Sequence, residues 1–245
     1  MKGTILQPTY LPWLGFFDMI DTSDVFVVYD HAQFVKKSWH CRNRIKTNNG
    51  ELMLSVPIKK APQKTPICDI KINEQYTLKK HWKTISHAYC KSRYFEDYKD
   101  VFADLYDKEF VFLRDLNVAI IKTICTMLGI SKKIQYSSEL DLQEDERNLC
   151  RTGKIINICK KMGITSLYDS KGSRELLDCS IFDKEHINIR FQDIKFPHYF
   201  QLYDEFITHL SVIDLIFNEG EKSLEIIRSG RKFKRYQIGT NKYIA

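Results

Sequence analysis

The sequence predicts an α/β fold with a mainly parallel, Rossmann-like sheet and a largely helical section in the middle of the chain. The first observation is that residues 3–30 show the pattern strand, helix, strand, which makes two neighbouring strands parallel. The second is that short β-branched or aromatic runs alternate with helical patterns again between residues 134 and 191. Both ends of the chain therefore contribute to one α/β core.

The opening unit is bounded by proline and by polar residues. The first strand is expected to end at about Gln7, because Pro8 has no N–H to donate to a sheet. Pro12 suits the first turn of a helix of two to three turns, which ends near residues 21–23. Residues 25–29 form a continuous apolar run, typical of a strand that is buried on both faces.

The later elements follow from periodicity and turn signals. A turn at residues 47–50 precedes an alternating strand that ends at Pro57, and a proline- and lysine-rich loop follows it. The remaining expected strands cover residues 67–72, 134–136, 164–168 and 187–191. The expected helices cover residues 77–93, 98–128 with a break near 107–109, 147–161, a stub at 175–177, and a last helix from about Phe206 to Asn218.

These elements divide the chain into four regions. Residues 1–75 form an N-terminal α/β unit with the motifs QPTYLPWLG and RNRIK, and residues 76–132 form a helical section. Residues 133–228 are a C-terminal α/β part that completes the same core, and residues 229–245 are a basic tail.

The composition is that of a globular protein, with 43% hydrophobic and 28% charged residues. No run approaches the ~20 apolar residues of a membrane span, and the N-terminus lacks a signal-peptide pattern, so a cytoplasmic location is expected. The seven cysteines are odd in number and none is spaced as CxxC, which argues against a disulfide framework and a bound metal. Cys41, between His40 and Arg42, is the thiol whose neighbours come closest to lowering its pKa.

The net charge of +7 favours an anionic partner such as a nucleotide sugar, a phosphorylated cofactor, RNA or anionic lipid. The excess is concentrated in residues 79–93 and in the tail that begins at Arg228. Plain solubilising charge remains the alternative interpretation.

Polar side chains gather where the first two strands end. In parallel sheets ligands bind beyond the carboxyl ends of the strands, so these side chains are candidates for a binding site. The candidates are Gln7, Tyr10 and Trp13 after the first strand, and Asp30, Gln33, Lys36, Trp39, Arg42, Asn43 and Arg44 after the second. The alternative is a solvated basic loop with its aromatic residues packed beneath it.

Two further polar segments lie nearer the C-terminus. The turn at residues 169–174 offers backbone amides that suit a phosphate or carboxylate. The last helical region contributes His198, Gln201, Asp214 and Asn218, and either His198 or Asp214 suits a general base. A structural ion pair of Asp214 with Arg42 or Arg44 is the alternative.

Three segments of the chain resemble the WbqC-like protein family: QPTYLPWLGFFDMI, SDVFVVYDHAQFVKKSWHCRNRIK and FQLYDEFITHLSVIDLIFNEG. They occur in the right order and lie at both ends of the chain. The resemblance implies a role in bacterial surface-polysaccharide biosynthesis, especially of the O-antigen of lipopolysaccharide. It also implies transfer of an aminoacyl or other acyl group onto an amino sugar.

The leading hypothesis is therefore an acyl or aminoacyl transferase that acts on a nucleotide-linked amino sugar. Lys36, Arg42 and Arg44 would neutralise phosphate, while Trp39 or Tyr10 would stack on a base or sugar. Gln7 and Asn43 would orient the substrate, with Trp13, Gln33, Gln201 and Asn218 as further binding residues, and the proton would pass to Asp30, His198 or Asp214. The cofactor is unknown, and the acyl donor stays open between aminoacyl-tRNA, a carrier-protein thioester, a coenzyme A thioester and an amino acid with ATP.

Two alternatives belong to other classes. The opening unit also resembles HIGH-type nucleotidyltransferases and adenylate-forming ligases, which would use ATP or CTP with Mg²⁺. The corresponding turn here, residues 11–15, contains no histidine, so that chemistry would be absent or carried by other groups. The other alternative is a non-catalytic protein that binds RNA or a protein partner through its basic surface.

Overall fold

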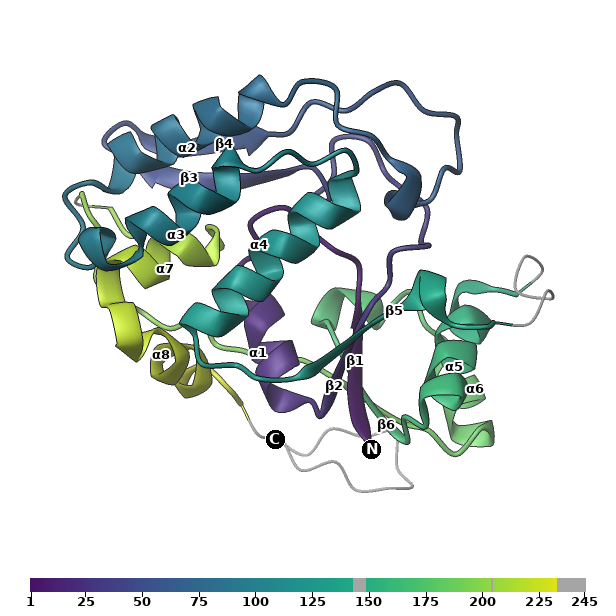
Figure 1. Ribbon diagram of the computed structural model, residues 1–245. Helices are drawn as coiled ribbons and strands as arrows, with labels where there is room; N and C mark the ends of the chain where they lie inside the picture. The colour runs from purple at the N-terminus through teal and green to yellow at the C-terminus, as the bar shows by residue number, and fades with distance from the viewer. Residues whose placement is uncertain (143–148, 204, 233–245) are drawn as a thin grey trace.

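The computed structural model describes residues 1–142, 149–203 and 205–232. Its centre is a five-stranded sheet in which every strand pair is parallel (Figure 1). In spatial order the strands are β5 (Lys133–Tyr136), β2 (Val25–Val28), β1 (Lys2–Leu6), β6 (Ser166–Asp169) and β7 (Asn188–Phe191). The predicted α/β fold with a mainly parallel sheet is confirmed.

The strand order places a switch point between β1 and β6. The chain first moves from β1 outward through β2 to β5, and then returns past β1 to continue through β6 to β7. Where the connections after two neighbouring parallel strands run to opposite sides of the sheet, a crevice opens at the carboxyl ends of those two strands. Here those strands are β1 and β6.

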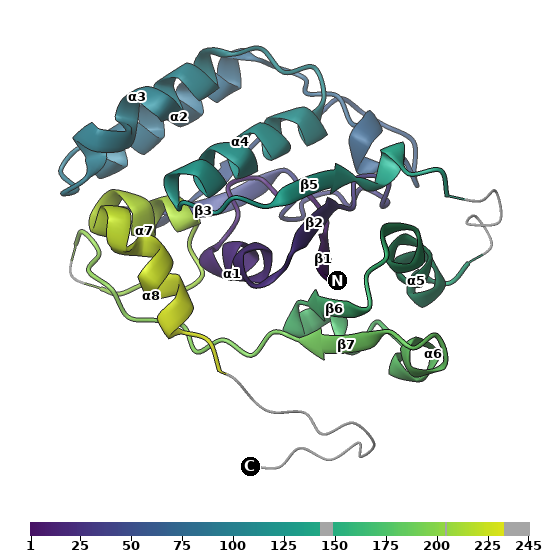
Figure 2. The same ribbon diagram turned by 60° about the horizontal axis from the view of Figure 1, so that its bottom comes forward.

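Helices cover both faces of the sheet. The longer helices are α1 (Leu14–Thr22), α2 (Tyr76–Tyr89), α3 (Phe95–Asp107), α4 (Leu113–Met127), α5 (Arg151–Met162), α6 (Cys179–Lys184), α7 (Val212–Glu219) and α8 (Ser223–Ser229). One-turn 3₁₀ helices are η1 (Ile67–Asp69), η2 (Ser137–Glu139), η4 (Lys171–Ser173) and η5 (Gly220–Lys222). Figure 2 shows α5 and α6 on the opposite side of β1 from α1 and α4.

Alternation along β1 and β2 explains why both faces are covered. Leu6, Phe26 and Val28 belong to the larger hydrophobic cluster with α1, α4 and α7, whereas Ile5 and Val27 belong to a smaller cluster with α5 and α6. Strands buried on both faces need apolar residues at successive positions. The continuous apolar runs of the sequence therefore identify the two central strands.

One local prediction is wrong: residues 67–72 do not form a strand, and their first three residues form η1. Residues 42–47, for which the sequence predicted no strand, form β3 (Arg42–Thr47), which pairs with β4 (Gly50–Ser55) as an antiparallel hairpin. Asn43 and Ile45 are buried and alternate with the half-buried Arg42 and Arg44. Because the buried position 43 is polar and its neighbours are cationic, the sequence lacks the apolar–polar alternation by which a strand is recognised.

The helical middle section matches its prediction more closely. The chain breaks between α3 and α4 at residues 108–112, close to the break expected at 107–109. The last long helix begins only at Val212, after Ser211, whose Oγ accepts from the N–H of Ile213 at 3.4 Å. Helix α6 is not anticipated by the sequence pattern, and the stub expected at 175–177 is a turn.

Most of the predicted basic tail, residues 233–245, lies outside the described residues. Within the described ranges, none of the helices combines the length and the apolar character that crossing a membrane requires.

Candidate functional site

A pocket of about 670 Å³ lies at the carboxyl ends of β1, β2 and β6, beside the switch point. A volume of this order suits a small organic ligand. Its polar lining comprises Gln7, Thr9, Tyr29, His31, Gln33, Arg151, Lys154, Asp169, Ser170 and Ser173. Its apolar lining comprises Ile5, Leu6, Trp13, Phe16, Met19, Ala32, Val35, Leu149, Ile155, Leu176 and Leu177.

The turn after β1 is held by side chains from two other elements. Asn117 of α4 donates from Nδ2 to the carbonyls of Pro8, at 3.1 Å, and His40, at 2.7 Å. Asn43 of β3 donates from Nδ2 to the carbonyl of Leu11 at 2.6 Å, where the backbone has an unusual positive φ of 46°. These buried amides join the turn after β1 to the segment after β2.

Gln7 is fixed directly at the pocket wall. Its Oε1 accepts a hydrogen bond from His40 Nε2 at 2.9 Å. Burial lowers the pKa of His40 to about 4, so its imidazole is neutral at pH 7. When Nε2 carries the imidazole proton, the contact leaves the Gln7 amide N–H₂ available to the pocket.

Trp13, Phe16 and Met19 form the wall on the α1 side, and Gly15 lies against the Trp13 ring. A Cβ on Gly15 would lie 2.3 Å from two atoms of the Trp13 indole, so glycine is needed for the ring to lie over the first turn of α1. The indole also stacks with His209 at 5.4 Å between ring centroids. The WLG triplet of the first motif therefore sets the position of an aromatic ring beside the pocket.

Asp169 ends β6 and presents a buried carboxyl at the pocket. Its Oδ1 accepts from the N–H of Ser170 at 2.6 Å and from Ser173 Oγ at 3.0 Å. Burial raises the pKa of Asp169 to about 6, and the two hydrogen bonds oppose the shift. A carboxyl with this pKa is mostly ionised at pH 7 and is able to accept a proton.

The N-terminal turn of α5 faces the same space with two cations. Arg151 and Lys154 both line the pocket, and the first turn of α5 contains no acidic residue. The N-terminus of a helix carries a partial positive charge from the helix dipole. The side chains of Arg151 and Lys154 add to this charge, so the positive potential at this wall of the pocket is high. The arrangement suits an anionic ligand group such as phosphate.

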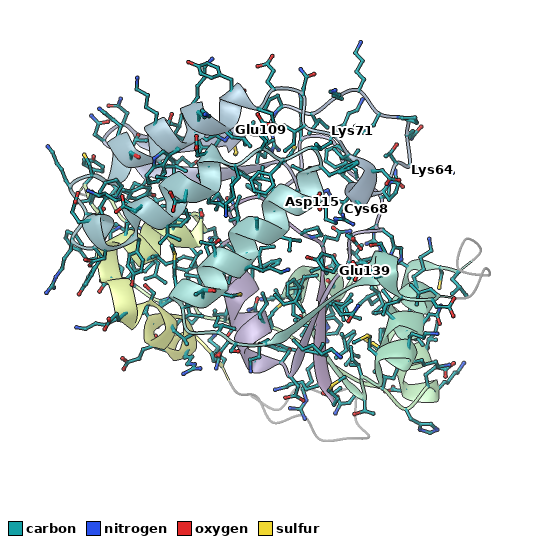
Figure 3. The ribbon with its side chains drawn as sticks, in the orientation of Figure 1. Lys64, Cys68, Lys71, Glu109, Asp115 and Glu139 are labelled. Atoms are coloured by element: carbon teal, nitrogen blue, oxygen red, sulfur yellow. The ribbon has the colours of Figure 1, made fainter. Side chains whose placement is uncertain are left out.

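Asp30, predicted as catalytic, is fully buried at the end of β2 and does not line the pocket. Its carboxylate accepts from Ser137 Oγ at 3.0 Å and Ser138 Oγ at 2.6 Å, and pairs with Arg114 Nη1 at 3.2 Å. Its backbone carbonyl accepts from the N–H of Cys68, which is labelled in Figure 3. These contacts tie η2 and η1 to β2.

Of the predicted binding residues after the first two strands, the pocket brings together Gln7, Trp13 and Gln33. Tyr10 is fully buried, and its hydroxyl lies 2.8 Å from both His81 Nδ1 and the Tyr106 hydroxyl. The other predicted members lie outside the pocket lining: Lys36, Trp39, Arg42, Asn43 and Arg44. Of these, Lys36 and Trp39 are exposed, whereas the arginines are half-buried.

The predicted residues near the C-terminus form a separate group around Asp214. Asp214 is fully buried and accepts from the hydroxyls of Tyr89 at 3.0 Å and Tyr199 at 2.8 Å. Burial raises the pKa of Asp214 to about 6. Gln201 donates to the Tyr199 hydroxyl at 3.1 Å, and Asn218 donates to the backbone carbonyl of Asp214 at 2.7 Å.

This Asp214 group does not line the pocket, and neither does His198. His198 is exposed and stacks on Phe206 at 4.1 Å between ring centroids. Arg44 pairs with Glu51 at 2.7 Å, across the hairpin. Catalytic roles for Asp214 and His198 stay predictions.

Sequence reasoning proposed the 169–174 turn as an anion site, and residues of this turn line the pocket, but it did not single out the Asp169 carboxyl, Arg151 or Lys154. The signal for Asp169 was an acidic residue directly after a strand. The signal for the two cations was their place in the first turn of a helix, where acidic residues are the favoured type.

Cys41 is buried, and burial raises the pKa of its thiol despite the opposing charge of Arg42. It therefore lacks the lowered pKa that a nucleophilic thiol needs. Among the described residues, no group of three or more His, Cys, Asp or Glu side chains is arranged to hold a metal ion.

A family model and one curated relative match most of the chain. The profile of the WbqC-like protein family matches residues 7–226. The uncharacterized protein Rv1507c of Mycobacterium tuberculosis (strain ATCC 25618 / H37Rv) is 30% identical over 234 residues, which cover 94% of this chain and 99% of that protein. No solved structure matches the chain significantly. The chain belongs to the WbqC-like protein family.

Proposed function

We propose that this protein is a transferase that moves an acyl or aminoacyl group onto the amine of a nucleotide-linked amino sugar in surface-glycan biosynthesis. The observation that carries the proposal is a single pocket that contains a buried carboxyl, Asp169, and two cations, Arg151 and Lys154. Membership of the WbqC-like protein family supports the biosynthetic context.

In this proposal the cations and the 170–173 turn hold the phosphates of the acceptor. Arg151 supplies a fork of donors that matches phosphate oxygens, and Lys154 lies one helical turn further along α5. Trp13, on another wall, offers apolar ring atoms for contact with a sugar or base. The Gln7 amide orients the acceptor by a hydrogen bond.

In the proposed reaction, Asp169 is the base that accepts a proton from the attacking amine. The amine nitrogen attacks the acyl carbonyl carbon and forms a C–N bond, while the bond from that carbon to the oxygen or sulfur of the donor breaks. The amine gives one proton to the Asp169 carboxylate, and the protonated Asp169 then passes this proton to the leaving oxygen or sulfur, which departs as an alcohol or thiol. A base with a pKa near neutrality suits this exchange.

A thermal-shift titration with uridine- and thymidine-diphosphate amino sugars tests the acceptor site. At a concentration of 100 Kd a ligand stabilises the folded protein by about 2.7 kcal/mol. For a chain of this length such a gain raises Tm by about 5–10 °C. The double variant Arg151→Ala/Lys154→Ala removes two charge-assisted contacts, so Kd rises about 100-fold and the same concentration stabilises by only about 0.4 kcal/mol.

The matched control is Lys161→Ala, an exposed lysine in the last turn of the same helix, which should keep the full shift. A full shift in the double variant would contradict the phosphate site. A response to ATP with Mg²⁺ alone would favour an adenylate-forming ligase over the transferase.

A further inference from the structure

Outside the basic tail, the positive charge of this protein is concentrated in one continuous segment, residues 31–93. That segment contains 14 of the 38 Lys and Arg residues but only three of the 31 Asp and Glu residues, a net charge of +11. The rest of the chain has 24 basic and 28 acidic residues, a net charge of −4. The overall value of +7 therefore conceals a very uneven distribution of charge along the chain.

The basic residues of this segment lie on the outside. Eleven of them are exposed, and we call this set the basic surface: Lys36, Lys37, Lys59, Lys60, Lys64, Lys71, Lys79, Lys80, Lys83, Lys91 and Arg93. In the described part of the chain only Lys79 of this set pairs with a carboxylate, that of Asp107 at 2.9 Å. Most of the positive charge is thus not neutralised within the protein.

The basic surface occupies one side of the molecule and reaches the pocket. The hairpin β3–β4, η1 and α2 lie together in the upper part of Figure 1, and Lys64 and Lys71 lie on the loops beside η1 in Figure 3. Gln33 and Val35 line the pocket, and Lys36 and Lys37 follow them directly along the chain. The rim of the pocket therefore continues into the basic surface.

Exposed aromatic rings accompany the cations. Trp39 is 47% exposed, and the Arg44 guanidinium lies 5.6 Å from its ring centroid. Tyr76 is 66% exposed, and Lys80 Nζ lies 4.7 Å from its ring centroid. Solvent-exposed rings among cations are the pattern that binds unpaired nucleotides by stacking and by phosphate contact.

The basic surface has a sharp boundary at α3. Residues 94–112 contain six acidic and two basic residues, and α3 packs directly against α2. A polyanion on α2 would be repelled on the α3 side. The charge pattern thus directs a long anionic partner from α2 along the loops around η1 toward the pocket.

We propose that the basic surface binds RNA, and that the acyl donor is an aminoacyl-tRNA whose body lies on this surface while its acylated 3′ end reaches the pocket. The second half of this statement rests on the proposed transferase function, whereas the RNA contact stands on the charge distribution and the exposed aromatic rings. In the transfer, the ester bond to the terminal ribose breaks, the C–N bond to the sugar amine forms, and the ribose hydroxyl regains a proton.

The test measures binding of fluorescently labelled, deacylated bacterial tRNA to the nuclease-treated full chain at several salt concentrations. We expect affinity to fall steeply with salt, because each phosphate contact releases counterions. The variant Lys60→Gln/Lys64→Gln/Lys80→Gln/Lys83→Gln should lower affinity at least ten-fold at 100 mM salt and reduce the salt slope by about one per lost contact.

The matched control changes four exposed lysines outside the basic surface: Lys108, Lys122, Lys184 and Lys222 to Gln. It should bind tRNA almost as well as the unchanged chain. Equal losses in the two variants, no tRNA binding at low salt, or binding only to an acidic acyl carrier protein or to vesicles of phosphatidylglycerol and phosphatidylcholine would each overturn the RNA proposal.

The same variants separate this proposal from the acceptor site. The basic-surface variant should keep its thermal shift with a nucleotide amino sugar, and Arg151→Ala/Lys154→Ala should keep its tRNA affinity. A chain that binds the sugar but not tRNA refutes the RNA surface alone. A chain that binds tRNA but no nucleotide sugar confirms the surface and removes the basis for the proposed acceptor.

Discussion

Asp169→Asn is expected to lower kcat of the proposed transfer by about 10²–10⁴-fold while KM changes little. Asparagine keeps an oxygen to accept from Ser170 N–H and Ser173 Oγ, so the turn keeps its hydrogen bonds. It cannot take the amine proton. Steady-state kinetics on the donor and acceptor pair found by titration measure the effect.

The same substitution, which lowers kcat, should raise the stability of the folded protein above about pH 6. The pKa of Asp169 is raised to about 6 in the folded protein from 3.8, so the folded state holds this proton more tightly than the unfolded chain. In the unchanged protein, the contribution of Asp169 to the free energy of unfolding therefore falls by up to ~3 kcal/mol as the pH rises from about 4 to about 6. Asp169→Asn should lose that dependence and be more stable at pH 8.

The control for both readouts is Glu175→Gln, which removes an exposed carboxyl a few residues away. It should change neither kcat nor the pH dependence of unfolding. The pKa of Asp214 is raised to a similar value, so Asp214 also contributes to the pH dependence of the free energy of unfolding. The contribution of Asp169 is therefore the difference between the curves of the unchanged protein and of Asp169→Asn. If Asp169→Asn retains full kcat, another group accepts the proton.

Asn117→Ala should destabilise the protein by about 2–4 kcal/mol. Its amide is fully buried and donates to the carbonyls of Pro8 and His40, which lose this donor when the side chain is truncated. Because these carbonyls belong to the loops that position Gln7, affinity for the acceptor should also fall. Urea denaturation with the ligand titration measures both effects.

Thr126→Ala is the control on the same helix, since its exposed hydroxyl bonds only within α4, to the Lys122 carbonyl at 3.1 Å. We expect it to alter stability by less than about 0.5 kcal/mol. A comparable small loss in Asn117→Ala, with unchanged ligand affinity, would show that the two loops do not depend on this amide.

The parallel core could be predicted because its signals are local. Continuous apolar runs, as in residues 25–28, and helix stops such as Gly163, with φ of 67°, depend on neighbouring residues alone. The hairpin at residues 42–55 was predicted only in part, because Arg42 and Arg44 alternate with buried residues while keeping partial exposure. Long side chains with charged ends hide such a strand pattern.

The candidate site was harder to predict because it depends on the strand order. Sequence order places Gln7 and Gln33 after neighbouring strands, and both line the pocket. The contributions of Asp169 and Arg151 require β6 to lie beside β1, a long-range pairing that no local pattern encodes. Tyr10 illustrates the reverse case, since its hydroxyl finds buried partners 71 and 96 residues away.

Hydrogen-exchange mass spectrometry with a stabilising nucleotide amino sugar tests the central claim that the acceptor binds in the pocket at the carboxyl ends of β1 and β6. Bound ligand should slow exchange in residues 7–16, 149–155 and 169–177, and leave exchange in residues 198–203 and 205–218 unchanged. Slowed exchange confined to residues 36–46 and 198–218, around Lys36, Arg42, Arg44 and Asp214, would contradict the claim and place the acceptor site there instead.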